Sequence, residues 1–107
     1  MKYKITDKQL DDVIFLYLDN QDFIKSEEYD LKYDFIYFIN SESDEDAQIR
    51  FDKDYGTCTI NPLLVKEISN FFSLSDGHSI DVIVKWVEYT LQMKVSRIFT
   101  NTPYRWH

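Results

Sequence analysis

Glycine, proline and cysteine are scarce: the 107 residues include 2 Gly, 2 Pro and 1 Cys. So few chain-breaking residues argue against long flexible linkers. Two glycines also nearly exclude a phosphate-cradling loop, and no P-loop or dinucleotide-binding motif is present. The lone cysteine, Cys58, cannot form an intramolecular disulfide, so the chain does not require an oxidising compartment. One cysteine and 2 His do not make a zinc site.

Long apolar runs are also missing. No stretch approaches the ~20 residues that a membrane-spanning helix needs, and the start Met-Lys-Tyr-Lys-Ile lacks the apolar region of a signal peptide. We therefore expect a cytoplasmic protein that does not enter a membrane. The chain does contain 44% hydrophobic residues, with 8 Tyr, 8 Phe and 2 Trp, which predicts one folded domain over residues 1–107.

The net charge of −7 is unevenly spread along the chain. Residues 1–54 hold 15 acidic against 7 basic residues, whereas residues 55–107 hold 4 against 5. An acidic half repels phosphate backbones and anionic membrane surfaces, so direct nucleic-acid binding is not expected. The same half attracts basic proteins and speeds encounter with them. The simpler interpretation is that the acidity serves solubility alone.

The clearest predicted helix lies near the N-terminus. Thr6 and Gln9 have the spacing of a capping box, in which each side chain bonds the backbone of the other residue. The helical pattern ends near Asp19 and Asn20. Its apolar stripe consists of Leu10, Val13, Ile14, Tyr17 and Leu18.

A three-stranded antiparallel meander is predicted next. Residues 21–32 are polar and indicate a loop or a short helical turn. The first strand that follows is apolar on both faces, which is typical of a central strand, and the next alternates polar with apolar residues. Gly56 is expected to supply a positive φ in the turn before the third. The predicted strands are residues 33–39, 48–52 and 57–60, with residues 95–99 as a candidate fourth.

Two further helices are predicted in the second half. Asn61 caps the first of them and Pro62 occupies its first position. Ser79 caps the second, after a turn at Asp76-Gly77. The resulting order α-β-β-β-α-α-β predicts an α+β fold, a small antiparallel sheet with about three helices on one face. The buried stripes are Leu64, Ile68, Phe71 and Phe72 in the first helix, and Ile80, Ile83, Val84, Val87 and Leu91 in the second.

The loop Glu42-Ser-Asp-Glu-Asp46 is the most conspicuous polar feature. It offers carboxylates but lacks the Gly and the bidentate Glu of a calcium loop, so neither a metal nor another cofactor is expected. We expect a solvated loop, in which the double change Asp44→Asn with Asp46→Asn leaves stability nearly unchanged. As candidate interface residues we select Glu42, Asp44, Glu45 and Asp46.

The tail Tyr104-Arg-Trp-His107 supplies two more candidate interface residues, Tyr104 and Trp106. Unpacked Trp and Arg side chains at the end of a chain are energetically unfavourable. The tail therefore either docks on its own domain, which we favour, or contacts a partner. Cys58 is expected in the core rather than as a nucleophile, and His78 in a solvent-facing loop. No catalytic residue is selected.

Four segments carry a resemblance: the opening Met1–Leu10, Ala47–Asp52, Ile68–Leu74 and Trp86–Lys94. They resemble a group of small proteins encoded by phages and environmental genomes. The resemblance implies a viral or bacterial origin. It implies no known activity, and no functional residue follows from it.

Three functional hypotheses remain open. The first is a small non-enzymatic module, phage-encoded on the resemblance above, that binds or regulates a protein partner. One version is an acidic mimic of DNA that inhibits a basic host protein, and it requires carboxylates gathered on one face. The alternative is a virion or assembly protein that forms a homo-oligomer through a large apolar interface. An enzyme, which we do not expect, needs a concave pocket with convergent polar groups.

Overall fold

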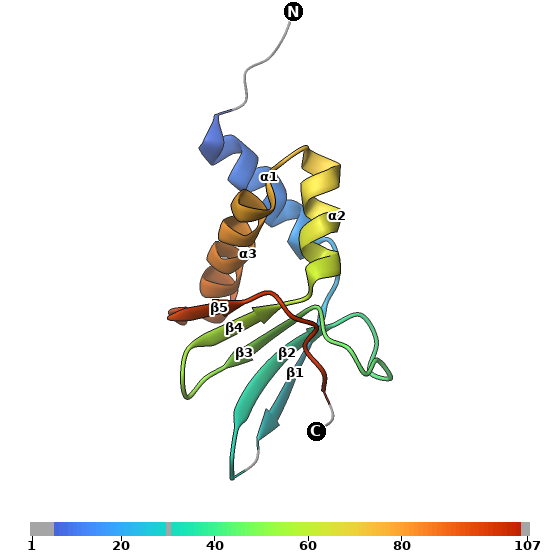
Figure 1. Cartoon of the computed structure of the whole chain (residues 1–107), viewed down its shortest axis with the longest axis vertical. Coiled ribbons are helices and arrows are strands. Elements are labelled where there is room, and N and C mark those ends of the chain that lie inside the picture. Colours follow the sequence, from blue (N-terminus) through green and yellow to red (C-terminus); the bar gives the residue numbers. More distant parts are fainter. Residues whose placement is uncertain (1–5, 30, 106–107) are drawn as a thin grey trace, which may run out of the picture.

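The computed structural model describes residues 6–29 and 31–105. Within them the chain forms three helices and five strands in the order α-β-β-β-β-α-α-β (Figure 1). The α+β prediction is confirmed, with one strand more than the predicted order contains. The helices are α1 (Asp7–Asp19), α2 (Pro62–Phe72) and α3 (Asp76–Leu91), and the strands are β1 (Ile24–Tyr29), β2 (Asp34–Ile39), β3 (Ile49–Asp52), β4 (Thr57–Ile60) and β5 (Arg97–Phe99).

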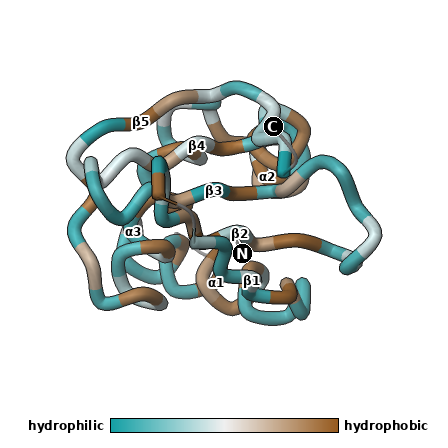
Figure 2. The backbone as a smooth tube through the Cα atoms, turned by 90° about the horizontal axis from the view of Figure 1, so that it is seen from below, coloured by the Kyte–Doolittle hydropathy of each residue, from teal (hydrophilic) through white to brown (hydrophobic). Residues whose placement is uncertain are grey.

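The strands form one mixed sheet in the order β1-β2-β3-β4-β5, which Figure 2 shows as a stack. Strands β1 to β4 pair antiparallel, as expected of a meander, whereas β5 pairs parallel with β4. The last pairing is parallel because α2 and α3 form a crossover that returns the chain to the same end of the sheet. The sheet is therefore five-stranded and mixed, rather than antiparallel with three or four strands.

Strand β1 corrects the sequence interpretation, which assigned residues 21–32 to a loop or a helical turn. Its sequence Ile-Lys-Ser-Glu-Glu-Tyr has weak strand propensity of its own. It pairs with β2 from Ile24 opposite Ile39 to Tyr29 opposite Asp34, and its other edge is open. Edge strands accept charged residues because one edge and much of their surface meet water. The partner strand, rather than local preference, therefore determines this conformation.

The core lies between the helices and one face of the sheet. Side chains alternate along a strand, so Ile36 and Phe38 of β2 point toward the helices while Tyr37 and Ile39 point away. Each fully buried aliphatic side chain contributes about 1.5–3 kcal/mol to stability. The helix-side core includes Ile14, Leu18, Ile49, Ile60, Leu64, Ile68, Val82, Ile83 and Val87.

The predicted starts of α1 and α2 are confirmed. The side-chain oxygen of Thr6 accepts the N–H of Gln9 at 3.2 Å, and Gln9 Oε1 accepts the N–H of Thr6 at 2.9 Å. The capping box is therefore complete. At the start of α2, Asn61 Oδ1 accepts the N–H of Leu63 at 2.9 Å.

Helix α3 begins earlier than predicted. Its N-cap is Ser75 rather than Ser79, because Ser75 Oγ accepts the N–H of His78 at 3.1 Å. Asp76 follows in the first turn, where the helix dipole favours a carboxylate, so the predicted turn is part of the helix. Ser79 is fully buried, and its Oγ lies 2.8 Å from Ser69 Oγ of α2.

The predicted buried stripe of α2 is correct for Leu64 and Ile68 but wrong for Phe71, which is 68% exposed. The Phe71 ring lies on the outer side of the helix, with its centroid 5.2 Å from that of Tyr17 in α1. Phe72, which the predicted stripe also contains, is partly buried and packs against the core.

Candidate functional site

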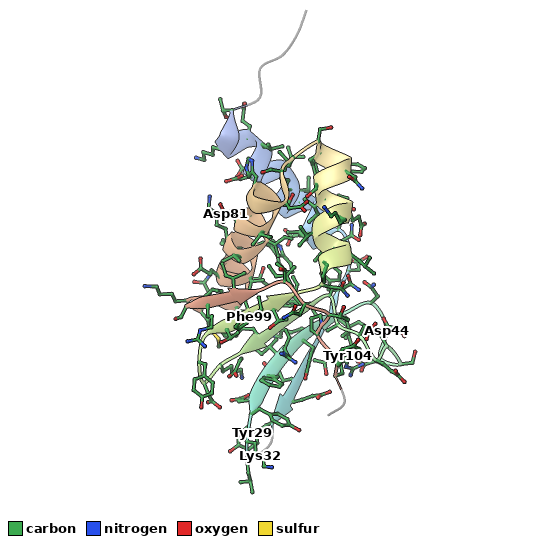
Figure 3. The ribbon with its side chains drawn as sticks, viewed as in Figure 1. Tyr29, Lys32, Asp44, Asp81, Phe99 and Tyr104 are labelled. Atoms are coloured by element: carbon green, nitrogen blue, oxygen red, sulfur yellow. The ribbon has the colours of Figure 1, made fainter. Side chains whose placement is uncertain are left out.

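Two segments that are far apart in the sequence lie side by side at one end of the sheet. We name residues 41–46 the acidic loop and residues 102–105 the C-terminal segment. Ala47 donates its N–H to the carbonyl of Pro103 at 2.8 Å, and Arg105 donates its N–H to the carbonyl of Glu45 at 2.8 Å. Between these bonds Asp46 and Tyr104 form an isolated antiparallel bridge. Figure 3 shows Asp44 and Tyr104 in this region.

The buried Arg105 side chain holds the acidic loop in place by bonding to its backbone carbonyls. It is only 5% exposed, and its Nη1 donates to the carbonyls of Glu42 and Asp44 at 2.8 and 2.9 Å. Its Nη2 lies 3.6 Å from a carboxylate oxygen of Glu28 and 4.0 Å from one of Glu42. Hydrogen bonds from a charged donor are stronger than neutral ones, and the planar guanidinium holds several acceptors at once. Arg105 therefore fixes the path of the loop.

The loop also stabilises its own turn. Asp44 donates its N–H to the Ser41 carbonyl at 3.0 Å, and its carboxylate accepts the Ser41 N–H at 3.1 Å. Ser41 Oγ lies 3.0 Å from Ser43 Oγ. At tight turns, short polar side chains form hydrogen bonds to the backbone in place of the regular backbone–backbone bonds of a helix or sheet. The expectation of a simply solvated loop is incomplete, because its backbone is tied down while most of its carboxylates face water.

The exposed part of this region contains most of the candidate interface residues. Glu42, Glu45 and Asp46 are exposed, with 72% of the Glu42 side chain accessible, and Tyr104 is 59% exposed. We name these four residues the acidic surface. Asp44 is half-buried and belongs to the turn. Trp106, the sixth selected residue, lies outside the described residues.

The C-terminal segment and the acidic loop adjoin the face of the sheet that the helices leave open. Tyr37 lies on that face yet is fully buried, and burial followed by the nearby Glu28 carboxylate raises its pKa to about 12. The Arg50 guanidinium lies 4.9 Å from the ring centroid of Phe35, and the Tyr33 ring stacks on Phe35 at 4.8 Å. This face therefore combines aromatic and charged groups with the buried aliphatic side chains of Ile39 and Ala47.

Sequence reasoning missed Arg105, Tyr37 and Arg50 as parts of this arrangement. The one usable signal was the tail itself, in which an Arg between aromatic residues favours docking. That prediction holds for Tyr104 and Arg105, whereas His107 lies with Trp106 beyond the described part of the chain.

The other side chains considered for chemistry, Cys58 and His78, lie in surroundings that support the fold. Cys58 is fully buried as expected, and burial raises its pKa to about 12, which keeps the thiol protonated. His78 lies in α3 rather than in a loop, with its Nε2 3.6 Å from Asp11 of α1. Within residues 6–29 and 31–105, no group of three or more His, Cys, Asp or Glu side chains is arranged to hold a metal.

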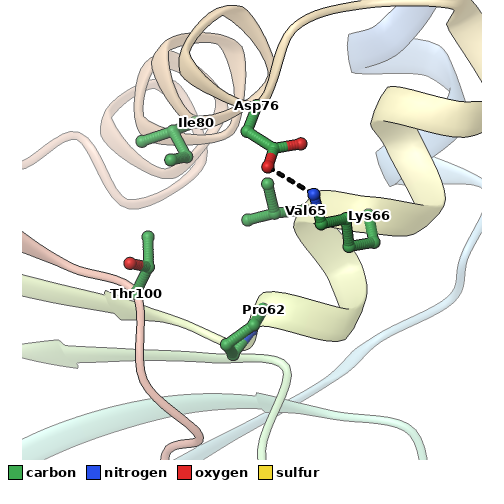
Figure 4. A pocket seen from close by; sticks show the side chains of 6 residues that line it. All are labelled: Pro62, Val65, Lys66, Asp76, Ile80 and Thr100. Atoms are coloured by element: carbon green, nitrogen blue, oxygen red, sulfur yellow. Dashed lines mark hydrogen bonds and ion pairs between the residues drawn. The ribbon is translucent and has the colours of Figure 1, made fainter.

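A small cavity of about 110 Å³ lies between the start of α2 and the start of α3 (Figure 4). Lys66 Nζ and Ser69 Oγ donate to Asp76 at its edge, at 2.6 and 2.9 Å. These bonds lower the pKa of Asp76, so its carboxylate is ionised at neutral pH and serves as a link between the two helices.

No known protein family matches the chain, and no curated protein or solved structure is significantly similar to it. The resemblance to phage-encoded proteins therefore stays a prediction. None of the helices in the described ranges has the length and apolar character to cross a membrane.

Proposed function

We propose that this protein is a small non-enzymatic binding module of the cytoplasm that offers its acidic surface to a basic protein partner. One observation carries the proposal: the buried Arg105 holds the backbone of the acidic loop, so that three carboxylates and Tyr104 are presented together on an ordered segment. A surface ordered before binding loses less conformational entropy when a partner docks. Tyr is also among the residues that most often dominate protein interfaces.

The distribution of acidic residues favours this local surface over a mimic of DNA. Carboxylates occur on α1, on the sheet, in the loops and on α3, and several support the fold itself. Asp19 accepts a hydrogen bond from Trp86, Asp76 pairs with Lys66, and Glu88 accepts the N–H of Val95. A phosphate-like row on one face is therefore not supported, and we propose recognition by one charged patch instead.

The test compares two variants that carry the same change in charge. One neutralises the acidic surface by Glu42→Gln, Glu45→Gln and Asp46→Asn. The other neutralises exposed carboxylates elsewhere, by changes chosen on α1, the β3–β4 turn and α3. The control changes are Asp12→Asn, Asp54→Asn and Asp81→Asn.

A panel of Lys- and Arg-rich peptides is first screened for binding to the unaltered protein, and the tightest peptide is then measured calorimetrically with both variants. The proposal expects the acidic-surface variant to bind at least roughly tenfold more weakly, with a much smaller loss in the control. An equal loss in both variants would show that only total charge matters and would contradict the proposal.

A homo-oligomeric structural protein is the second candidate, favoured by apolar side chains on the outer helix faces. Leu16 is 59% exposed, Leu63 is 74% exposed and Phe71 is 68% exposed. Light scattering after size-exclusion chromatography tests this alternative. It expects a salt-independent oligomer that Phe71→Glu dissociates, whereas the binding-module proposal expects a monomer.

A further inference from the structure

A second cavity, of about 260 Å³, lies between the end of α1, the start of β1 and the last turns of α3. Its volume is just below the ~300–1,000 Å³ of typical ligand sites, which suits a ligand of a few heavy atoms. Six of the residues that line it determine its chemistry: Asp19, Asp22, Phe23, Lys25, Phe38 and Trp86.

Three aromatic rings form a fixed wall of this cavity. The Trp86 ring centroid lies 5.1 Å from that of Phe38 and 6.0 Å from that of Phe23. Trp86 is 4% exposed, and its Nε1 donates to Asp19 Oδ1 at 2.9 Å. That hydrogen bond fixes the orientation of the indole, and all three aromatic side chains line the cavity.

The second feature is negative charge without a basic partner. Asp19 ends α1, and Asp22 follows in a left-handed conformation with φ of 54°. In the described part of the chain, no Lys or Arg forms an ion pair with either carboxylate. Neither α1 nor α3 has a basic residue in its last turn, so nothing basic there offsets the negative end of either helix dipole. Lys25 also lines the cavity, but its ammonium lies 4.0 Å from Glu27.

We propose that this cavity binds a small organic ammonium ion, with the positively charged nitrogen against the aromatic wall and near Asp19 and Asp22. An aromatic face attracts a cation through its quadrupole, and the attraction increases when the cation leaves water. Two carboxylates add Coulomb attraction. An anion of the same size is repelled, and a neutral molecule gains only the apolar contact.

The experiment uses two probes of nearly identical shape: choline, and its uncharged carbon analogue 3,3-dimethylbutan-1-ol. Binding to the ¹⁵N-labelled protein is followed through the indole N–H resonance of Trp86, which Trp106→Phe assigns. We expect choline to produce a saturable shift and to bind roughly 3- to 30-fold more tightly than the alcohol. No saturable shift with choline, or equal affinity for both probes, would overturn the proposal.

Variants that remove single carboxylates test whether choline binds beside Asp19 and Asp22. Asp22→Asn is expected to weaken choline binding about two- to fivefold, and Asp19→Asn to do the same, since Asn can still accept the Trp86 hydrogen bond. Neither change should affect the alcohol. Asp81→Asn, on an exposed residue of α3 (Figure 3), is the matched control and should leave both affinities unchanged. If Asp81→Asn weakens choline binding as much as Asp22→Asn does, the site assignment is wrong.

Discussion

The two faces of the sheet are closed in different ways. On one face, three helices cover aliphatic and aromatic side chains that meet no water, such as Ile49 and Ile60. On the other, a short C-terminal segment and the acidic loop meet around a buried Arg105, beside Tyr37. The first face gains its stability from apolar burial, which has no directional requirement. The second adds a few directional hydrogen bonds to a small apolar cluster of Tyr37, Ile39 and Ala47. Its loop is therefore easier to disturb locally without unfolding the protein.

The largest expected effect is on the helix-covered face. Ile83→Ala removes a fully buried side chain of α3 and leaves a cavity, which lowers the free energy of unfolding by about 2–5 kcal/mol. Urea denaturation measures this loss. A change below about 1 kcal/mol would mean that α3 does not pack tightly on the sheet.

The second-largest loss of stability is expected on the face of the sheet that the acidic loop and the C-terminal segment adjoin. Arg105→Met keeps much of the side-chain bulk but removes the charged donors to Glu42 and Asp44, and we expect a loss of about 1.5–3 kcal/mol. Hydrogen exchange should accelerate locally, above all at Ala47, whose N–H bonds to Pro103. Arg97→Met, on an exposed arginine of β5, is the control and should change neither stability nor exchange. Unchanged exchange at Ala47 in Arg105→Met would show that the arginine does not hold the loop.

A smaller, pH-dependent effect is expected at Tyr37. Its pKa is raised from 10.0 to about 12 in the folded protein, so folding favours the protonated phenol. This contribution to stability is complete below pH 10 and is lost as the pH rises toward 12. Tyr37→Phe should therefore reduce the loss of stability above pH 10 in alkaline urea titrations. Part of the loss persists, because the pKa of Tyr17 is raised to about 12 as well, by burial and by its hydrogen bond to Glu67. If the free energy of unfolding falls equally above pH 10 in Tyr37→Phe and in the unaltered protein, the Tyr37 phenol does not contribute to this loss.

The smallest effect is expected from Asp44→Asn combined with Asp46→Asn. Asn can accept the Ser41 N–H in place of the Asp44 carboxylate, and Asp46 is exposed, so stability should change by no more than about 0.5 kcal/mol. Thermal unfolding provides the measurement. A loss of several kcal/mol would place these carboxylates in the structural support of the fold.

The same contrast explains which parts of the structure could be predicted from the sequence. The capping box of Thr6, the Asn61-Pro62 helix start and the positive φ of Gly56, observed at 66°, are encoded by neighbouring residues. The alternating and helical apolar patterns likewise predicted the α+β class. All these signals lie within a few positions of the residues that they describe.

The parts that could not be predicted depend on distant partners. Ile24–Tyr29 become a strand because β2 lies beside them, against their weak local preference. Arg105 is ordered by carbonyls at Glu42 and Asp44, about sixty positions earlier in the chain. Nothing in the local pattern near either end specifies that contact. The acidic loop and the tail could be selected separately as interfaces, but not recognised as one surface.

The central claim, that the acidic surface is where a basic partner docks, is tested most directly by mapping amide shifts of the ¹⁵N-labelled protein as the tightest basic peptide is added. The account predicts that the largest shifts fall in residues 41–47 and 102–105, and that they shrink in the Glu42→Gln, Glu45→Gln, Asp46→Asn variant. Shifts concentrated on α1 and α2, or spread evenly over acidic residues throughout the chain, would contradict it.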